Sequence, residues 1–143
     1  MRLRNNVLLA ASITTAFATG VAKVASAGPS DNAREWKAPV SAAERKNPLP
    51  PGPRSTAAGK AIYERECASC HGSGGKGDGK DGMDLRTRPT DLSSPIVAGQ
   101  SDGALFWKVT TGRRPMPGFR KDLTDEERWQ VVNFIRTLES RRQ

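Results

Sequence analysis

The chain has 143 residues, a formal net charge of +8 and 36% hydrophobic residues, which suits one small domain with a targeting segment and excludes two full domains. Its mean hydropathy of −0.60 predicts a modest apolar core, so a metal, a disulfide or a large buried cofactor is expected to add cohesion. Few stretches alternate apolar and polar residues, and valine and isoleucine fall mostly at helical spacings, which favours an all-α fold.

Residues 1–27 have the features of a cleaved export signal. Arg2 and Arg4 give a positive start, residues 7–18 form an apolar stretch, and residues 25–27 (Ala-Ser-Ala) form a small-residue cleavage site. The alternative is a membrane anchor, but the apolar run is shorter than the roughly 20 residues that a spanning helix needs. We therefore predict an exported, periplasmic protein of bacterial type.

Cleavage after Ala27 would remove Arg2, Arg4 and Lys23 and lower the net charge from +8 to about +5. The remaining positive charge predicts partner proteins with acidic surfaces, and weak attraction to anionic membrane surfaces. The lysines and arginines are dispersed and no nucleic-acid-binding motif is present, so we expect no nucleic acid partner.

Residues 28–54 are polar and rich in proline, with four prolines between positions 48 and 53. Closely spaced prolines favour extended polyproline conformation and exclude a helix. We interpret this segment as a tether or a poorly ordered lead-in, in which Trp36 is the one large side chain able to dock elsewhere. The remaining residues, 55–143, are expected to form the folded domain.

Two helices are predicted in the first part of that domain. One runs from Ser55 or Thr56, either of which can cap it, towards Cys67. The next begins near Ser101 and stops at Gly112, because glycine is the preferred residue just past a helix end.

The third helix is the clearest. Thr124 and Glu127 form a capping box, and Asp125 and Glu126 favour the positive end of the helix. Its apolar residues fall at helical spacings: Trp129, Val131, Val132, Phe134, Ile135 and Leu138.

Between the first two helices, residues 72–82 are rich in glycine and aspartate and are interpreted as a surface loop. The segment contains no phosphate-binding G-x-x-x-x-G-K-[ST] string, and no predicted strand precedes it.

The string Cys67-Ala68-Ser69-Cys70-His71 has the C-x-x-C-H spacing of a c-type haem attachment motif. Two thiols one helical turn apart can each add to a vinyl group on the same porphyrin edge, and the adjacent imidazole can then reach the iron.

Four other uses of these residues are weaker. A disulfide would leave His71 unexplained, and a thioredoxin-like pair needs a preceding strand. Zinc would need further ligands and an iron–sulfur cluster needs four cysteines, whereas the chain has 2 Cys and 1 His. One covalently attached haem c is therefore predicted.

With one histidine in the chain, the second axial ligand has to come from Met83, Met116, a lysine, a tyrosine or an open site. Met83 follows His71 by only 12 residues, and such a short loop passes round a porphyrin less easily than the 45 residues that lead to Met116. Met116 lies between two prolines that stiffen its segment. We predict His71 and Met116 as the iron ligands, the alternative for Met116 being an ordinary core residue.

Residues 55–140 resemble class I (mono-haem) cytochrome c. The resemblance rests on Gly59-Lys-Ala-Ile-Tyr63, on C-A-S-C-H-G at 67–72, on Met116-Pro-Gly-Phe119 and on the segment from Leu123 to Trp129, in the family's order. It implies a small all-α class I cytochrome c fold, with about three main helices and long loops around one covalently bound haem.

The resemblance also implies particular contacts. Gly59 on the first helix should meet Phe134 on the last, with Tyr63 packing alongside. A proline carbonyl, best matched by Pro89, should accept a hydrogen bond from the His71 ring, which would fix its orientation.

The remaining tryptophans and arginines carry weaker predictions. Trp107 and Trp129 are expected in the core rather than as electron relays, although the Trp107 indole nitrogen is a candidate for contact with a haem propionate. A solvated surface is the default expectation for four arginines that are also propionate or docking candidates: Arg86, Arg88, Arg113 and Arg114.

The leading functional hypothesis is a monomeric electron carrier and not an enzyme, because an iron with both axial positions filled has no site for substrate. The alternative is a small haem enzyme or gas sensor in which Met116 leaves the iron open. A third reading keeps the chemistry and makes the chain a haem subunit, tethered by residues 28–54 to a larger redox enzyme.

Overall fold

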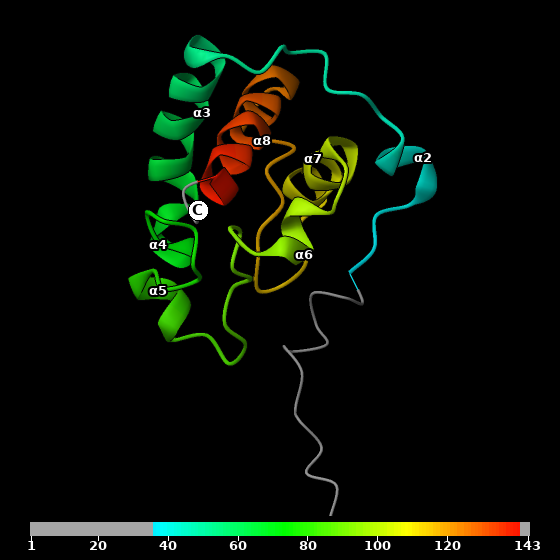
Figure 1. Ribbon diagram of the computed structural model, residues 1–143. Helices are drawn as coiled ribbons and strands as arrows, with labels where there is room; N and C mark the ends of the chain where they lie inside the picture. The colour runs from blue at the N-terminus through cyan, green and yellow to red at the C-terminus, as the bar shows by residue number, and fades with distance from the viewer. Residues whose placement is uncertain (1–35, 141–143) are drawn as a thin grey trace, which may run out of the picture.

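The computed structural model describes residues 36–140, and within them all regular structure is helical, as predicted. Residues 1–27, the predicted export signal, lie outside the described residues. Figure 1 shows two long helices lying side by side, with the shorter helices and loops around them. The helices are α2 (Val40–Ala43), α3 (Pro53–Glu66), α4 (Ala68–His71), α5 (Lys80–Met83), α6 (Pro95–Ala98), α7 (Asp102–Thr111) and α8 (Asp125–Ser140).

Helices α3 and α8 cross at Gly59. A Cβ atom on Gly59 would overlap the backbone carbonyl oxygen of Gln130, and it would lie 3.1 Å from the Cβ of Phe134. One turn further on, the rings of Tyr63 and Phe134 pack with centroids 4.9 Å apart, and both side chains are buried. The expected contact between the first and last helices is confirmed. The contact also places Cys67, at the end of α3, against the buried cluster that contains Tyr63 and Phe134.

Two of the three capping predictions are also confirmed, whereas the predicted cap at Ser55 or Thr56 is wrong, because α3 begins at Pro53 with Gly52 at the N-cap position. The side chain of Ser101 accepts a hydrogen bond from the Ala104 amide at 3.2 Å, and α7 ends at Gly112 with φ of 64°. At α8, the Thr124 amide donates to Glu127 Oε2 at 2.8 Å, and the Glu127 amide donates to Thr124 Oγ1 at 3.2 Å. The hydrogen bond from the Thr124 amide lowers the pKa of the Glu127 carboxyl, since it stabilises the charged carboxylate.

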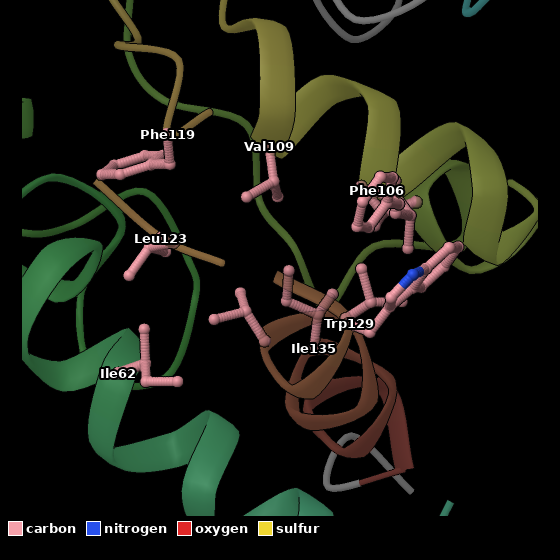
Figure 2. Packing of buried hydrophobic residues seen from close by; sticks show 11 residues of the cluster. Ile62, Phe106, Val109, Phe119, Leu123, Trp129 and Ile135 are labelled. Carbon is pink, nitrogen blue, oxygen red and sulfur yellow. The ribbon is translucent and has the colours of Figure 1, made fainter. Parts of the chain in front are cut away.

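The main apolar cluster is formed by residues of α3, α6, α7 and α8 and of the segment that joins α7 to α8 (Figure 2). Phe106 and Trp129 stack at one end, with ring centroids 4.0 Å apart. Phe119 and Leu123, from the joining segment, lie towards Ile62 of α3 at the other end. Trp129 is 1% exposed, which confirms it as a core residue. Within residues 36–140, no helix combines the length and apolar character that crossing a membrane requires.

The expectation of a poorly ordered lead-in is wrong for residues 36–52, hereafter the arm, because they pack against α7 and α8. Trp36 packs on Trp107 with ring centroids 6.2 Å apart. Ser101 Oγ donates to the carbonyl of Ala43 at 2.6 Å, and Gly103 lies so close to the arm that a Cβ there would overlap the Ala42 carbonyl oxygen. These contacts make the arm part of the domain.

A buried asparagine on α8 ties the arm to α3. Asn133, 4% exposed, accepts a hydrogen bond from Asn47 Nδ2 at 2.8 Å and donates to Ser55 Oγ at 2.6 Å. Asn47 also orders the arm locally, since its Oδ1 accepts from the Leu49 amide at 3.0 Å. One amide side chain therefore joins three segments of the chain.

Replacing Asn133 with alanine should lower the free energy of unfolding by about 1–3 kcal/mol, because Asn47 and Ser55 lose a buried partner. Urea unfolding of Asn133→Ala, Asn47→Ala and the double variant measures the effect. We expect the double variant to cost less than the sum of the singles, as for residues in one network. Strict additivity would show that the two amides act independently.

Candidate functional site

The C-x-x-C-H motif lies at the junction of α3 and α4. Cys67 lies between the two helices, as the C-cap of α3 and the N-cap of α4. Its carbonyl accepts hydrogen bonds from the amides of Cys70 at 3.2 Å and His71 at 2.9 Å. This turn holds both thiols and the imidazole on one short stretch of helix. Neither cysteine forms a disulfide, and both are half-buried. The two thiols are therefore available as a pair.

The Cys67 thiol is held in its protonated form. Burial raises its pKa to about 12, with further contributions from the charges of Glu66 and Cys70. Next to it, the buried hydroxyl of Tyr63 donates to the Gly72 carbonyl at 2.7 Å, and burial also raises the pKa of this tyrosine. An uncharged thiol beside a neutral phenol suits contact with an apolar group such as a porphyrin edge.

The imidazole of His71 is held by the carbonyl of Thr90, to which its Nδ1 donates at 3.2 Å. The prediction of Pro89 was wrong by one residue, because the Pro89 carbonyl oxygen lies against Gly77 instead. Burial lowers the pKa of His71, and the bond to Thr90 opposes this in part. The ring is thus neutral at pH 7, with Nε2 left as the nitrogen that can ligate a metal.

Residues 72–79 form the loop that we expected, with several residues exposed, but the loop folds tightly over the motif, and the last residues of the predicted loop belong to α5 instead. The Gly77 amide donates to the His71 carbonyl at 2.8 Å, and the Gly79 amide donates to the Cys70 carbonyl at 3.2 Å. Glycine permits this close approach, since a Cβ on Gly77 would overlap the Pro89 carbonyl oxygen and its φ of 73° suits glycine alone. The buried glycines within residues 72–82 are Gly72, Gly75, Gly77, Gly79 and Gly82.

Met116 sits at the end of a tight turn after α7. The Arg113 amide donates to the Met116 carbonyl at 3.0 Å and the Met116 amide donates back to the Arg113 carbonyl at 2.9 Å, with a cis Arg114–Pro115 bond between them. The base of the turn is closed where Gly118 lies against the Thr111 carbonyl oxygen, at a distance that leaves no room for a Cβ. The partly buried Met116 side chain packs against the main apolar cluster.

The other methionine candidate faces solvent. Met83, on α5, is 58% exposed. Trp107, predicted as a core residue and named as a propionate candidate, is half-buried and packs on Trp36 of the arm. All four arginines that were propionate or docking candidates, Arg86, Arg88, Arg113 and Arg114, are exposed.

Sequence reasoning missed two contributors, Thr90 and the buried glycines. A spacing signal for the glycines was present, since Gly75, Gly77 and Gly79 alternate with polar residues, as expected of a backbone that turns one side inward. No sequence signal marked Thr90, because it contributes its backbone carbonyl, which every residue type has. Within residues 36–140, no three His, Cys, Asp or Glu residues gather as a metal site.

The family model described as cytochrome C oxidase, cbb3-type, subunit III matches residues 54–135, more than half of the chain. The chain belongs to the class I cytochrome c family. Such a cytochrome is an electron-transfer protein with covalently bound c-type haem, and the donor set here fits that group: two free thiols on one turn, followed by a neutral imidazole.

Two similar proteins agree with this assignment. The cytochrome is 31% identical over 85 residues to cytochrome c6 of Picosynechococcus sp., a match that spans 55% of this chain and 69% of the relative. It also matches a chain of the Kuenenia stuttgartiensis reducing HAO-like protein complex, with a TM-score of 0.58 and 36% identity. That match covers 64% of this chain and 46% of the other chain, so it extends over less than half of the matched chain's length.

Proposed function

We propose that this cytochrome is a single-haem electron carrier in which Cys67 and Cys70 attach the haem and His71 and Met116 ligate the iron. The observation that supports this most directly is the bond from His71 Nδ1 to the Thr90 carbonyl, which leaves Nε2 for the metal. The stiff turn carrying Met116 and its packing against the apolar cluster support the second ligand. Solvent exposure of Met83 argues against that alternative.

When bound, the haem supplies a reversible one-electron couple. The residues of this chain hold and enclose it. The Thr90 carbonyl fixes the imidazole ring and raises its basicity, and the glycine-rich loop shields the attachment turn from water. Met116 as a ligand favours the reduced state relative to a second histidine. If His71 and Met116 both ligate the iron, it would have no free position for a substrate, which supports a carrier over an enzyme.

The proposed location is the periplasm, reached through the signal at residues 1–27, and the protein acts there as a monomer that shuttles between redox partners. Exposed cations gather in sequence around the Met116 turn: Arg113, Arg114, Arg120 and Lys121. They would steer partners with acidic surfaces to this face. The complex named for the Kuenenia stuttgartiensis structure favours a second role, as a haem subunit of a larger redox assembly.

The test of ligation is the near-infrared spectrum of the oxidised protein. We expect a weak sulfur-to-iron charge-transfer band in the wild type and in Met83→Ala, and its complete loss in Met116→Ala. The reduction potential of Met116→Ala should also fall, because the thioether ligand is gone. A wild-type spectrum of high-spin iron without this band would contradict the carrier and favour the enzyme or sensor with an open iron.

A further inference from the structure

A pocket lies away from the motif, between the arm, α7 and the start of α8. Its volume is about 380 Å³, within the range of small-molecule sites, and none of Cys67, Cys70, His71 and Met116 lines it. Arginines line it from three separate segments: Arg45 from the arm, Arg120 from the stretch after the Met116 turn, and Arg128 from α8. Thr110 of α7 also lines the pocket.

The charges around this pocket do not balance. The three arginines face one lining carboxylate, Asp125, which leaves a net charge of +2 at neutral pH (three minus one). Asp125 is shared, since it accepts from Arg45 at 3.2 Å and also pairs with Arg128. Its side chain is 62% exposed, so much of its charge is directed to water rather than to the buried guanidinium.

Two buried side chains at the pocket have polar atoms without a hydrogen-bond partner among the described residues. Arg128 is 4% exposed, and its Nε and Nη1 atoms have no hydrogen-bond acceptor among the described residues. The hydroxyl of Thr110, 7% exposed, has none either in this part of the chain. The Phe106 ring lies 5.1 Å from the Arg128 guanidinium, which favours the cation but offers no acceptor for its N–H groups.

A buried cation with unmade hydrogen bonds is costly unless an anion or another acceptor completes it. We propose that this pocket binds a small oxyanion of the phosphate type, held by Arg45, Arg120 and Arg128 with Thr110 as a neutral donor. An anion with a charge near −2 would balance the +2 of the lining, and arginine is the preferred cation for phosphate oxygens. A single carboxylate would leave half of the excess charge.

The test is calorimetric titration of the purified holoprotein with inorganic phosphate, at a constant ionic strength of about 0.15 M kept with sodium chloride. We expect saturable binding of one phosphate per chain. Arg120→Gln should weaken it by about threefold or more, because a charged hydrogen bond is lost. Lys121→Gln makes the same charge change one residue away, outside the pocket lining, and should change the affinity less than about twofold.

Thr110→Val separates binding from structure. This variant keeps the shape of the side chain and removes the hydroxyl, so without phosphate its melting temperature should stay level or rise. Its phosphate affinity should nevertheless fall. Absence of saturable binding in the wild type would overturn the proposal. So would equal losses in Arg120→Gln and Lys121→Gln, which would indicate a diffuse charge effect, or an unchanged affinity in Thr110→Val.

Discussion

Gly59→Ala should lower the free energy of unfolding by about 2–4 kcal/mol, although alanine is the better helix former by about 1 kcal/mol. The added methyl group would overlap the Gln130 carbonyl oxygen on α8, and backbone atoms on both sides leave no flexible group to give way. The helices would have to separate, and the packing of Tyr63 on Phe134 would loosen with them.

Urea unfolding of the holoprotein, followed by far-ultraviolet circular dichroism, measures this effect. Ala61→Gly is the matched control, since it makes the reverse change at an exposed position of the same helix. The control should cost about 1 kcal/mol from helix propensity alone. A Gly59→Ala protein as stable as the wild type would show that α3 and α8 can separate at no cost.

Gly77→Ala should have an effect of similar size, about 2–4 kcal/mol, for a different reason. The residue has a φ of 73°, which costs a residue with a side chain about 1–2 kcal/mol, and the methyl group would also overlap the Pro89 carbonyl oxygen. To avoid this overlap, the backbone at Pro89 and Thr90 has to move away from residue 77. The bond from His71 Nδ1 to the Thr90 carbonyl should then lengthen.

In the proposed site this makes the imidazole a weaker donor to the iron, so the reduction potential should rise. Spectroelectrochemical titration measures it, with Gly74→Ala as the control. Gly74 lies in the same loop, and the nearest atom to its Cβ position is the Lys76 side chain at 4.0 Å, so no change is expected there. A potential that shifts equally in both variants would mean that loop disorder, not the Thr90 carbonyl, is responsible.

The long helices could be predicted from sequence because their signals are local. Ser101 and Gly112 delimit α7, and the Thr124–Glu127 capping box stands at the start of α8. The start of α3 was placed two residues late, since Pro53 at the first helical position was counted with the preceding prolines. The helices α2, α4, α5 and α6 have four residues each, too few for a periodic pattern to emerge.

The parts that sequence reasoning missed depend on contacts between distant segments. The polar composition of the arm suggested a tether, but its amide and carbonyl groups find partners on α7 and α8, as at Asn47 and Ala43. In the site, residue types predicted which side chains can ligate or attach a haem. They did not predict that the partner of His71 is Thr90, because that depends on how the glycine-rich loop turns the chain.

The docked arm has a consequence for the order of assembly. Its partners lie far along the chain, since Ala43 pairs with a residue 58 positions later, Arg45 with one 80 later and Asn47 with one 86 later. Closing loops of this length costs conformational entropy, and the contacts that offset it form only once α7 and α8 are folded. The turn from Cys67 to His71 forms from neighbouring residues and lies inside the loop that the arm closes. We therefore expect the thiols to be presented for haem attachment while the chain is still open, with the arm closing afterwards.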